Sequence, residues 1–166
     1  MTKREIAERA SRPDGVKLAA NAFRIRPVDM ADLTSMYVVE PEHEGVCKIG
    51  IASNPFERLR GLQTASWRRL KIKALFWFKR WGDAASLEYD ALQFAKEQGL
   101  RLQGEWLDLD HMESIGLMLS TPGADKRKFT DNHGLVHDWF PEIQRQKLAE
   151  EDEYYARSPG RASRTA

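Results

Sequence analysis

The chain has 166 residues, 42% of them hydrophobic and 31% charged, which suits one ordinary domain with a hydrophobic core and short appendages. Its single cysteine excludes an intramolecular disulfide, and no apolar run approaches the length of a membrane span. The N-terminal residues lack the apolar centre of a signal peptide, so we expect a cytoplasmic protein with no membrane partner.

Residues 1–34 predict a helical N-terminal extension. Residues 2–11 fit a short amphipathic helix that ends at the turn Pro13-Asp14-Gly15. Residues 16–26 fit either a helix or an extended segment. No residue of this extension suggests a chemical role.

Residues 35–110 carry alternating strand and helix signals, which predict a mixed α+β domain. Two apolar runs, at 36–39 and 46–51, flank a polar loop with Pro and Gly, as in a β-hairpin. A third strand is predicted at 69–78, with one face formed by Leu70, Ile72, Ala74, Phe76 and Phe78. A short strand at 105–109 follows. We therefore expect a small, largely antiparallel sheet of three or more strands flanked by helices.

Two helices are predicted between these strands. The first covers Asn54–Gln63, because asparagine suits the N-cap position and Pro55 suits the first helical position. The second covers Asp83–Gln98, with hydrophobic residues along one face and Gly99 after its last turn.

Residues 111–156 predict a helical C-terminal extension. Asp108 or Asp110 suits the N-cap of a packing helix at 111–120, and a last helix is predicted to begin at Pro141. The intervening residues 124–134 are polar and predict a loop. The small, polar residues of 157–166 predict a disordered tail.

The net charge of +1 conceals a strongly basic segment between Pro55 and Arg80. This segment has eight basic residues and one acidic residue, hence +7, so the remainder of the chain carries −6. Such local charge favours contact with nucleic-acid phosphates. Four aromatic residues, Trp67, Phe76, Trp77 and Trp81, are interleaved with the cations and would allow base stacking. The alternative is a solvated basic face with the aromatic residues in the core.

Four residues of the 35–110 segment follow one another in a recognisable order. Tyr37 lies in the first apolar run, Lys48-Ile49-Gly50 follows after ten residues, Arg58 lies one turn into the next helix, and Glu88 lies on the second helix. This order resembles the GIY-YIG nuclease superfamily. The resemblance is closest to its divergent phage-type DNA-binding branch, because the chain also has Arg58-Leu59, Gln63-Thr64, Leu87-Glu88 and Gly104-Glu105-Trp106-Leu107.

The resemblance implies a DNA-binding protein with metal-dependent endonuclease activity. Its catalytic residues would be Tyr37, Lys48, Arg58 and Glu88, with Glu88 holding Mg²⁺ or Mn²⁺. Tyr37 would act as general base, and the charge of Lys48 would lower its pKa. The cations expected to bind nucleic acid are Arg60, Arg68, Arg69, Lys71, Lys73, Lys79 and Arg80.

Two departures from the family pattern affect the expected chemistry. Lys48 stands where the family more often has a second tyrosine, and Leu92 stands where this branch often has a histidine. Two alternatives therefore stay open: a catalytically silent DNA-binding module of the same fold, and a protein-interaction domain that uses a Trp-rich surface. Without the family pattern, Tyr37 is a half-buried strand aromatic and Glu88 an exposed helix acid.

Overall fold

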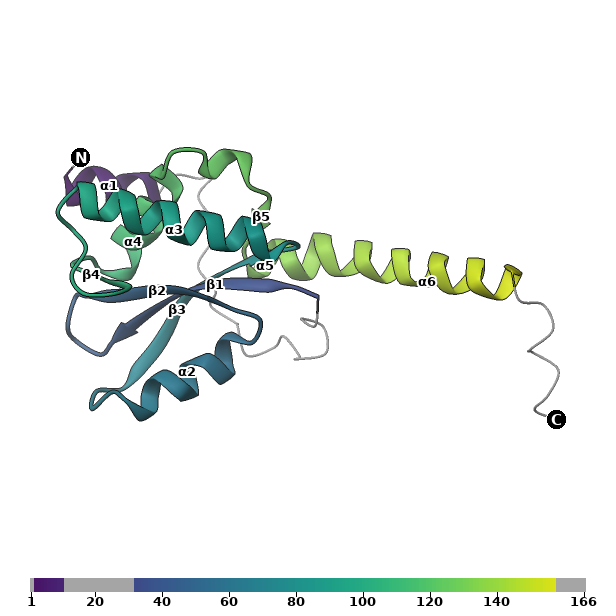
Figure 1. Ribbon diagram of the computed structural model, residues 1–166, viewed down its shortest axis with the longest axis horizontal. Helices are drawn as coiled ribbons and strands as arrows, with labels where there is room; N and C mark the ends of the chain where they lie inside the picture. Colours follow the sequence, from purple (N-terminus) through teal and green to yellow (C-terminus); the bar gives the residue numbers. More distant parts are fainter. Residues whose placement is uncertain (1, 11–31, 158–166) are drawn as a thin grey trace. The chain divides into compact units, whose positions relative to one another are not determined.

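The computed structural model describes residues 2–10 and 32–157 (Figure 1). The chain divides into two units, Met1–His133 and Gly134–Ala166. The helices and strands of the first unit are α1 (Lys3–Ala10), β1 (Thr34–Pro41), β2 (Cys47–Ala52), α2 (Pro55–Thr64), β3 (Leu70–Phe78), α3 (Trp81–Glu97), β4 (Trp106–Leu107), α4 (His111–Ser120), η3 (Ala124–Lys126) and β5 (Phe129–Thr130). They are followed by the short helix α5 (Asn132–Gly134), the π-helical turn η4 (Leu135–Trp139) and the helix α6 (Phe140–Arg157).

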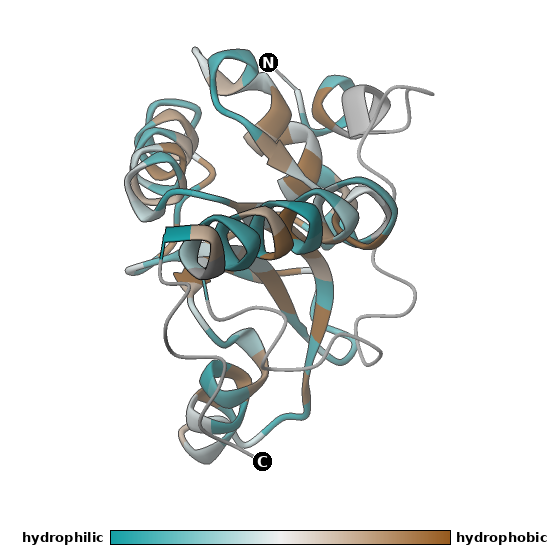
Figure 2. Cartoon of the chain, turned by 90° about the vertical axis from the view of Figure 1, so that its right-hand side faces the viewer, coloured by the Kyte–Doolittle hydropathy of each residue, from teal (hydrophilic) through white to brown (hydrophobic). Residues whose placement is uncertain are grey.

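The five strands form one antiparallel sheet in the order β4-β2-β1-β3-β5. Helix α2 lies on one face of the sheet, and α1, α3 and α4 lie on the other face (Figure 1). Hydrophobic residues run along the central strands between these helices (Figure 2). The predicted fold class, an α+β domain with an antiparallel sheet flanked by helices, is confirmed.

The helix ends follow local capping rules. The Asn54 side chain accepts hydrogen bonds from the N–H groups of Phe56 (3.2 Å) and Glu57 (3.1 Å), so the predicted start of α2 is confirmed. Helix α3 begins at Trp81, two residues before the predicted start, because Asp83 lies in its first turn instead of at its N-cap. Of the two candidate caps for α4, Asp110 is the one used, in a full capping box.

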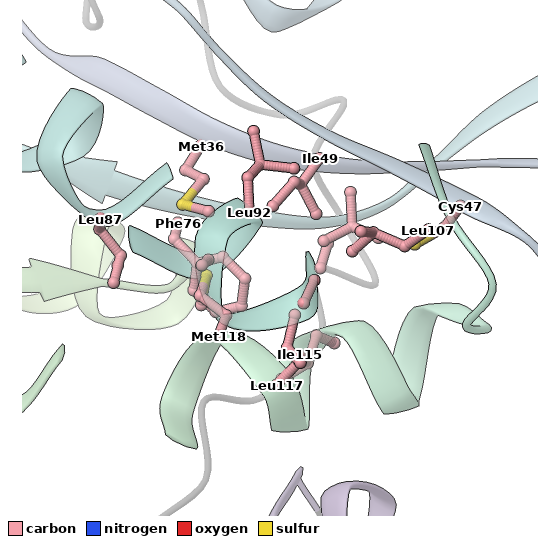
Figure 3. Packing of buried hydrophobic residues seen from close by; sticks show 14 of the residues in the cluster. Met36, Cys47, Ile49, Phe76, Leu87, Leu92, Leu107, Ile115, Leu117 and Met118 are labelled. Carbon is pink, nitrogen blue, oxygen red and sulfur yellow. The ribbon is translucent and has the colours of Figure 1, made fainter. Parts of the chain in front are cut away.

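The hydrophobic core lies between the sheet and the helices α1, α3 and α4 (Figure 3). Strand residues such as Met36 and Phe76 meet Leu87 of α3 and Ile115 of α4 in this core. Helix α4 packs closely on α1: a Cβ placed on Gly116 would lie 1.8 Å from the backbone oxygen of Ile6. The packing role predicted for the helix at 111–120 is thereby confirmed.

Strand β3 does not present one continuous hydrophobic face. Its pairing with β1 shifts register, because Val38 pairs with Ala74 whereas Val39 pairs with Ile72, which leaves Lys73 as an extra residue in β3. Such a bulge moves the following side chains to the opposite face. Ile72 and Leu70 therefore share the α2 side of the sheet with Val39, and the prediction that all five hydrophobic residues of β3 line one face is wrong.

The aromatic residues of the basic segment divide between the core and the surface. Phe76 and Trp77 are 1% and 0% exposed, so the prediction that they are available for base stacking is wrong. The Trp77 indole donates a hydrogen bond to Asn132 (2.5 Å). Trp67 and Trp81 are 85% and 64% exposed. Only these two of the four are accessible to a base.

The segment 124–134, predicted to be a loop, contains the short strand β5, in which Phe129 pairs with Phe78 and packs beside it. The predicted helices at 2–11 and from Pro141 correspond to α1 and α6. The predictions for residues 16–26 and for 158–166 of the tail lie outside the described residues. Among the helices that are described, none combines the length and apolar character needed to cross a membrane.

Candidate functional site

Tyr37 lies against Gly50 at the centre of the sheet. The two residues are paired across β1 and β2, and a Cβ at position 50 would lie 2.3 Å from the Tyr37 hydroxyl oxygen. Glycine is needed here because the tyrosine ring occupies the space that any other side chain would fill. Tyr37 is only 2% exposed, so it is more deeply buried than a half-buried strand aromatic.

Arg58 reaches Tyr37 from helix α2. The guanidinium forms a hydrogen bond with the phenol oxygen of Tyr37, and the two side chains influence each other's ionisation. Burial raises the pKa of Tyr37 above its ordinary value, and the bond from Arg58 opposes this rise only in part. The phenol is therefore neutral at physiological pH.

Glu88 reaches the sheet from α3 at the open edge of β2. Strand β4 has two residues and pairs only with Cys47 and Lys48, so it does not cover the later part of β2. The Glu88 carboxylate accepts a hydrogen bond from the Ile51 N–H there. Burial and the nearby Glu105 carboxylate raise the pKa of Glu88. The positive charge of Lys48 lowers it by a smaller amount.

Lys48 is 8% exposed and forms an ion pair with Glu105, which precedes β4. The backbone oxygen of Glu105 also accepts from the Ile49 N–H (3.2 Å). Glu105 thus covers one outward N–H of the β2 edge and Glu88 covers the next. The Lys48 ammonium pairs with Glu105, and the cation that opposes the rise in the Tyr37 pKa is Arg58. The pKa of Tyr37 is raised, so the expectation that it would be lowered is wrong.

These contacts join residues from four elements and one loop at a single place. We call them the β2-edge cluster: Tyr37, Lys48, Arg58, Glu88 and Glu105. The charges of Arg58, Glu88 and Glu105 all act on the pKa of Tyr37. The structure therefore brings together all four residues expected to be catalytic.

Glu105 was not among the residues expected at the site. The signal was the Gly104-Glu105-Trp106-Leu107 motif, which contributed to the resemblance without being given a chemical role. Its partner Lys48 is 57 residues away along the chain, and only the β2–β4 pairing brings the two together.

A divalent ion at this place would have few protein oxygens as ligands. No group of three or more His, Cys, Asp and Glu side chains that could hold a metal occurs among the described residues. Glu88 is a desolvated carboxylate near the Glu105 carboxylate, and both effects disfavour its charged form. A bound cation would offset them. Mg²⁺ commonly uses one or two carboxylates and keeps several waters, which agrees with this set.

The basic segment is partly neutralised by the acidic hairpin loop between β1 and β2. Arg68 pairs with Glu44, and Lys71 Nζ lies 2.5 Å from the Glu42 carboxylate. Two further ion pairs of this segment are longer: Lys73 with Glu40 at 3.8 Å and Arg80 with Asp83 at 3.9 Å. Arg60, Arg69 and Lys79 are exposed on α2 and at the two ends of β3.

Comparison with known proteins places the chain in a family. Residues 34–118 match the T5orf172 domain, so the chain belongs to the T5orf172 domain family. This is a phage-associated domain found in the context of HNH and GIY-YIG-like endonucleases, which gives the chain a nucleic-acid-related function. No curated protein and no solved structure matches the chain.

Proposed function

We propose that the protein is a cytoplasmic, divalent-metal-dependent DNA endonuclease of the GIY-YIG type. The observation that carries this proposal is the contact of Arg58 with Tyr37 beside Glu88. A phosphate-binding cation, a hydroxyl and a desolvated carboxylate at one place are what phosphodiester hydrolysis requires. Family membership supports a nucleic-acid substrate.

Arg58 binds the phosphate in this proposal. Its planar guanidinium offers paired N–H donors to two phosphoryl oxygens, and its position is held by the bond to Tyr37. The same charge opposes the negative charge that grows on these oxygens in the transition state.

The ionised form of Tyr37 accepts a proton from the attacking water as the water oxygen bonds to phosphorus and the bond from phosphorus to the leaving oxygen breaks. Because the pKa of Tyr37 is raised, little phenolate exists at neutral pH. The cleavage rate is therefore expected to increase with pH for as long as the protein stays folded.

Glu88 would hold the metal ion, which supplies charge compensation for the leaving oxygen when it is bound. The hydrogen bond from the Ile51 N–H orients the carboxylate at the sheet edge. Lys48 and Glu105 form an ion pair beside Glu88. In this proposal they hold the edge of β2 in position and take no part in the reaction.

One observation favours the second candidate, a catalytically silent DNA-binding module. Tyr37 is 2% exposed, so a water molecule must reach its hydroxyl through a small opening. Nicking of supercoiled plasmid in Mg²⁺, Mn²⁺ or EDTA, together with a binding titration, distinguishes the two functions. Binding without nicking in either metal would favour the silent module.

Within that assay, Arg58→Ala and Arg60→Ala form a matched pair on one helix. Arg58→Ala is expected to lower the nicking rate at saturating protein by about 100-fold or more, because a transition-state donor is lost. Arg60→Ala is expected to weaken binding and leave that rate nearly unchanged. If the two changes had equal effects on the rate, Arg58 would have no specific role in the reaction.

A further inference from the structure

An open pocket of about 520 Å³ adjoins the β2-edge cluster on the α2 side of the sheet. Its walls come from the ends of β1 and β2, the loop after α2 and the loop before β4. Lys48 belongs to both the pocket and the cluster. Gly50, over which the Tyr37 ring lies, is two residues along β2 from Lys48, or about 7 Å at the rise of a strand.

The pocket combines flat aromatic surfaces with a fixed cation. Trp67 enters it from the loop after α2 and Trp106 from β4, and Leu62 and Leu70 add apolar surface. The Arg68 guanidinium lies 4.4 Å from the centre of the Trp67 ring and is held by its ion pair with Glu44. Although Arg68 covers part of this ring, Trp67 remains 85% exposed.

These surfaces favour a planar, uncharged ring attached to an anionic chain. Indole rings stack on the faces of nucleobases without regard to sequence, and a neighbouring arginine adds to this attraction. Gln103 in the same pocket offers a side-chain amide, which can both donate and accept hydrogen bonds, to a base edge. A phosphate alone would gain nothing from the two indoles, and Glu44 would repel it.

We propose that this pocket binds a nucleobase displaced from a DNA duplex, next to the phosphodiester held at the β2-edge cluster. This inference rests on the proposed DNA-directed function and adds that the preferred substrate has an unpaired base. Displacement is least costly where the base is already unpaired, as at a bulge or mismatch. The pocket would thereby select distorted DNA and fix its backbone relative to Arg58.

Binding of labelled duplexes in EDTA, where no strand is cut, tests the inference. Three duplexes of one sequence are compared: fully paired, with one unpaired adenine, and with an abasic residue in place of that adenine. Fluorescence anisotropy should show the adenine bulge bound about 5-fold or more tightly than either of the others, because stacking of one base is gained. The abasic duplex keeps the flexible backbone and removes only the ring.

Two exposed tryptophans supply the variant and its control. Trp67→Ala should abolish the preference for the adenine bulge, whereas Trp81→Ala, on α3 and outside the pocket, should retain it. Neither change removes a buried side chain, and circular dichroism checks that both proteins fold.

The outcomes separate this inference from the proposed function. Wild type that binds no duplex contradicts both. Wild type that binds all three duplexes equally contradicts the pocket inference alone, as does a Trp67→Ala protein that keeps the preference. If Trp67→Ala changes no DNA affinity at all, the pocket serves another kind of ligand, such as a protein segment.

Discussion

The Glu88 carboxylate is held where its charged form is disfavoured. It is half-buried, lies near the Glu105 carboxylate, and has a raised pKa despite the attraction of Lys48 and the bond from the Ile51 N–H. A raised pKa means that, between the ordinary and the raised value, the folded protein binds more protons than the unfolded chain. In this pH range the stability contributed by neutral Glu88 is lost as pH rises.

Glu88→Gln is therefore expected to stabilise the protein at pH 7. Glutamine keeps an oxygen that accepts from Ile51 and carries no charge to desolvate. The gain should shrink as pH falls through the raised pKa of Glu88, because wild type then becomes neutral as well. Urea unfolding at pH 4 and pH 7 measures this. A variant that is less stable than wild type at pH 7 would mean that the Lys48 attraction outweighs burial.

At the scale of elements, two glycines allow close packing for different purposes. Gly50 makes room for the Tyr37 ring within the sheet, and Gly116 makes room for the backbone of α1 on α4. The first contact belongs to the β2-edge cluster and the second to the core. Alanine at each position should thus have separable effects.

Gly50→Ala and Gly116→Ala are each expected to cost about 1–3 kcal/mol in the free energy of unfolding, because the added methyl has no space. For Gly116, about 1 kcal/mol of helix propensity offsets part of that cost. Only Gly50→Ala should also lower the plasmid-nicking rate, since it displaces Tyr37. Measuring nicking at a temperature where both variants are folded separates an effect on the reaction from an effect on stability. Equal nicking rates for Gly50→Ala and Gly116→Ala would contradict the role of Tyr37.

The sequence predicted the elements whose signals are local. Asn54 and Pro55 mark the start of α2 through their own backbone preferences, and the resemblance placed Arg58 and Glu88 correctly on successive helices. The bulge at Lys73 and the Glu105–Lys48 pair were missed because both depend on strand pairing, which no local pattern specifies. Strand β5 is too short to show a period of two.

For the molecule as a whole, the distribution of charge matters more than its net value. The basic segment of +7 faces the acidic hairpin loop, where Glu42 and Glu44 pair with Lys71 and Arg68. The side chain of Lys71 lowers the pKa of Glu42, so this acid stays ionised. A DNA backbone must compete with these acids for the same cations.

Replacing Glu42 and Glu44 together with Gln should strengthen duplex binding, because two cations are released to the phosphates. The salt slope should become steeper by up to about 1.8, or about 0.9 for each added contact. Glu150→Gln with Glu151→Gln on α6 changes net charge equally and serves as the control. An equal response of both double variants would indicate an effect of net charge alone.

Plasmid nicking by Glu88→Gln in Mg²⁺ tests the β2-edge cluster most directly. With wild type and the control Glu97→Gln, an exposed acid near the end of the same helix, the rate is measured at saturating protein. Glu88→Gln should bind DNA at least as tightly as wild type and cut it at no measurable rate, whereas Glu97→Gln should match wild type. Nicking by Glu88→Gln at the wild-type rate would show that Glu88 takes no part in the reaction.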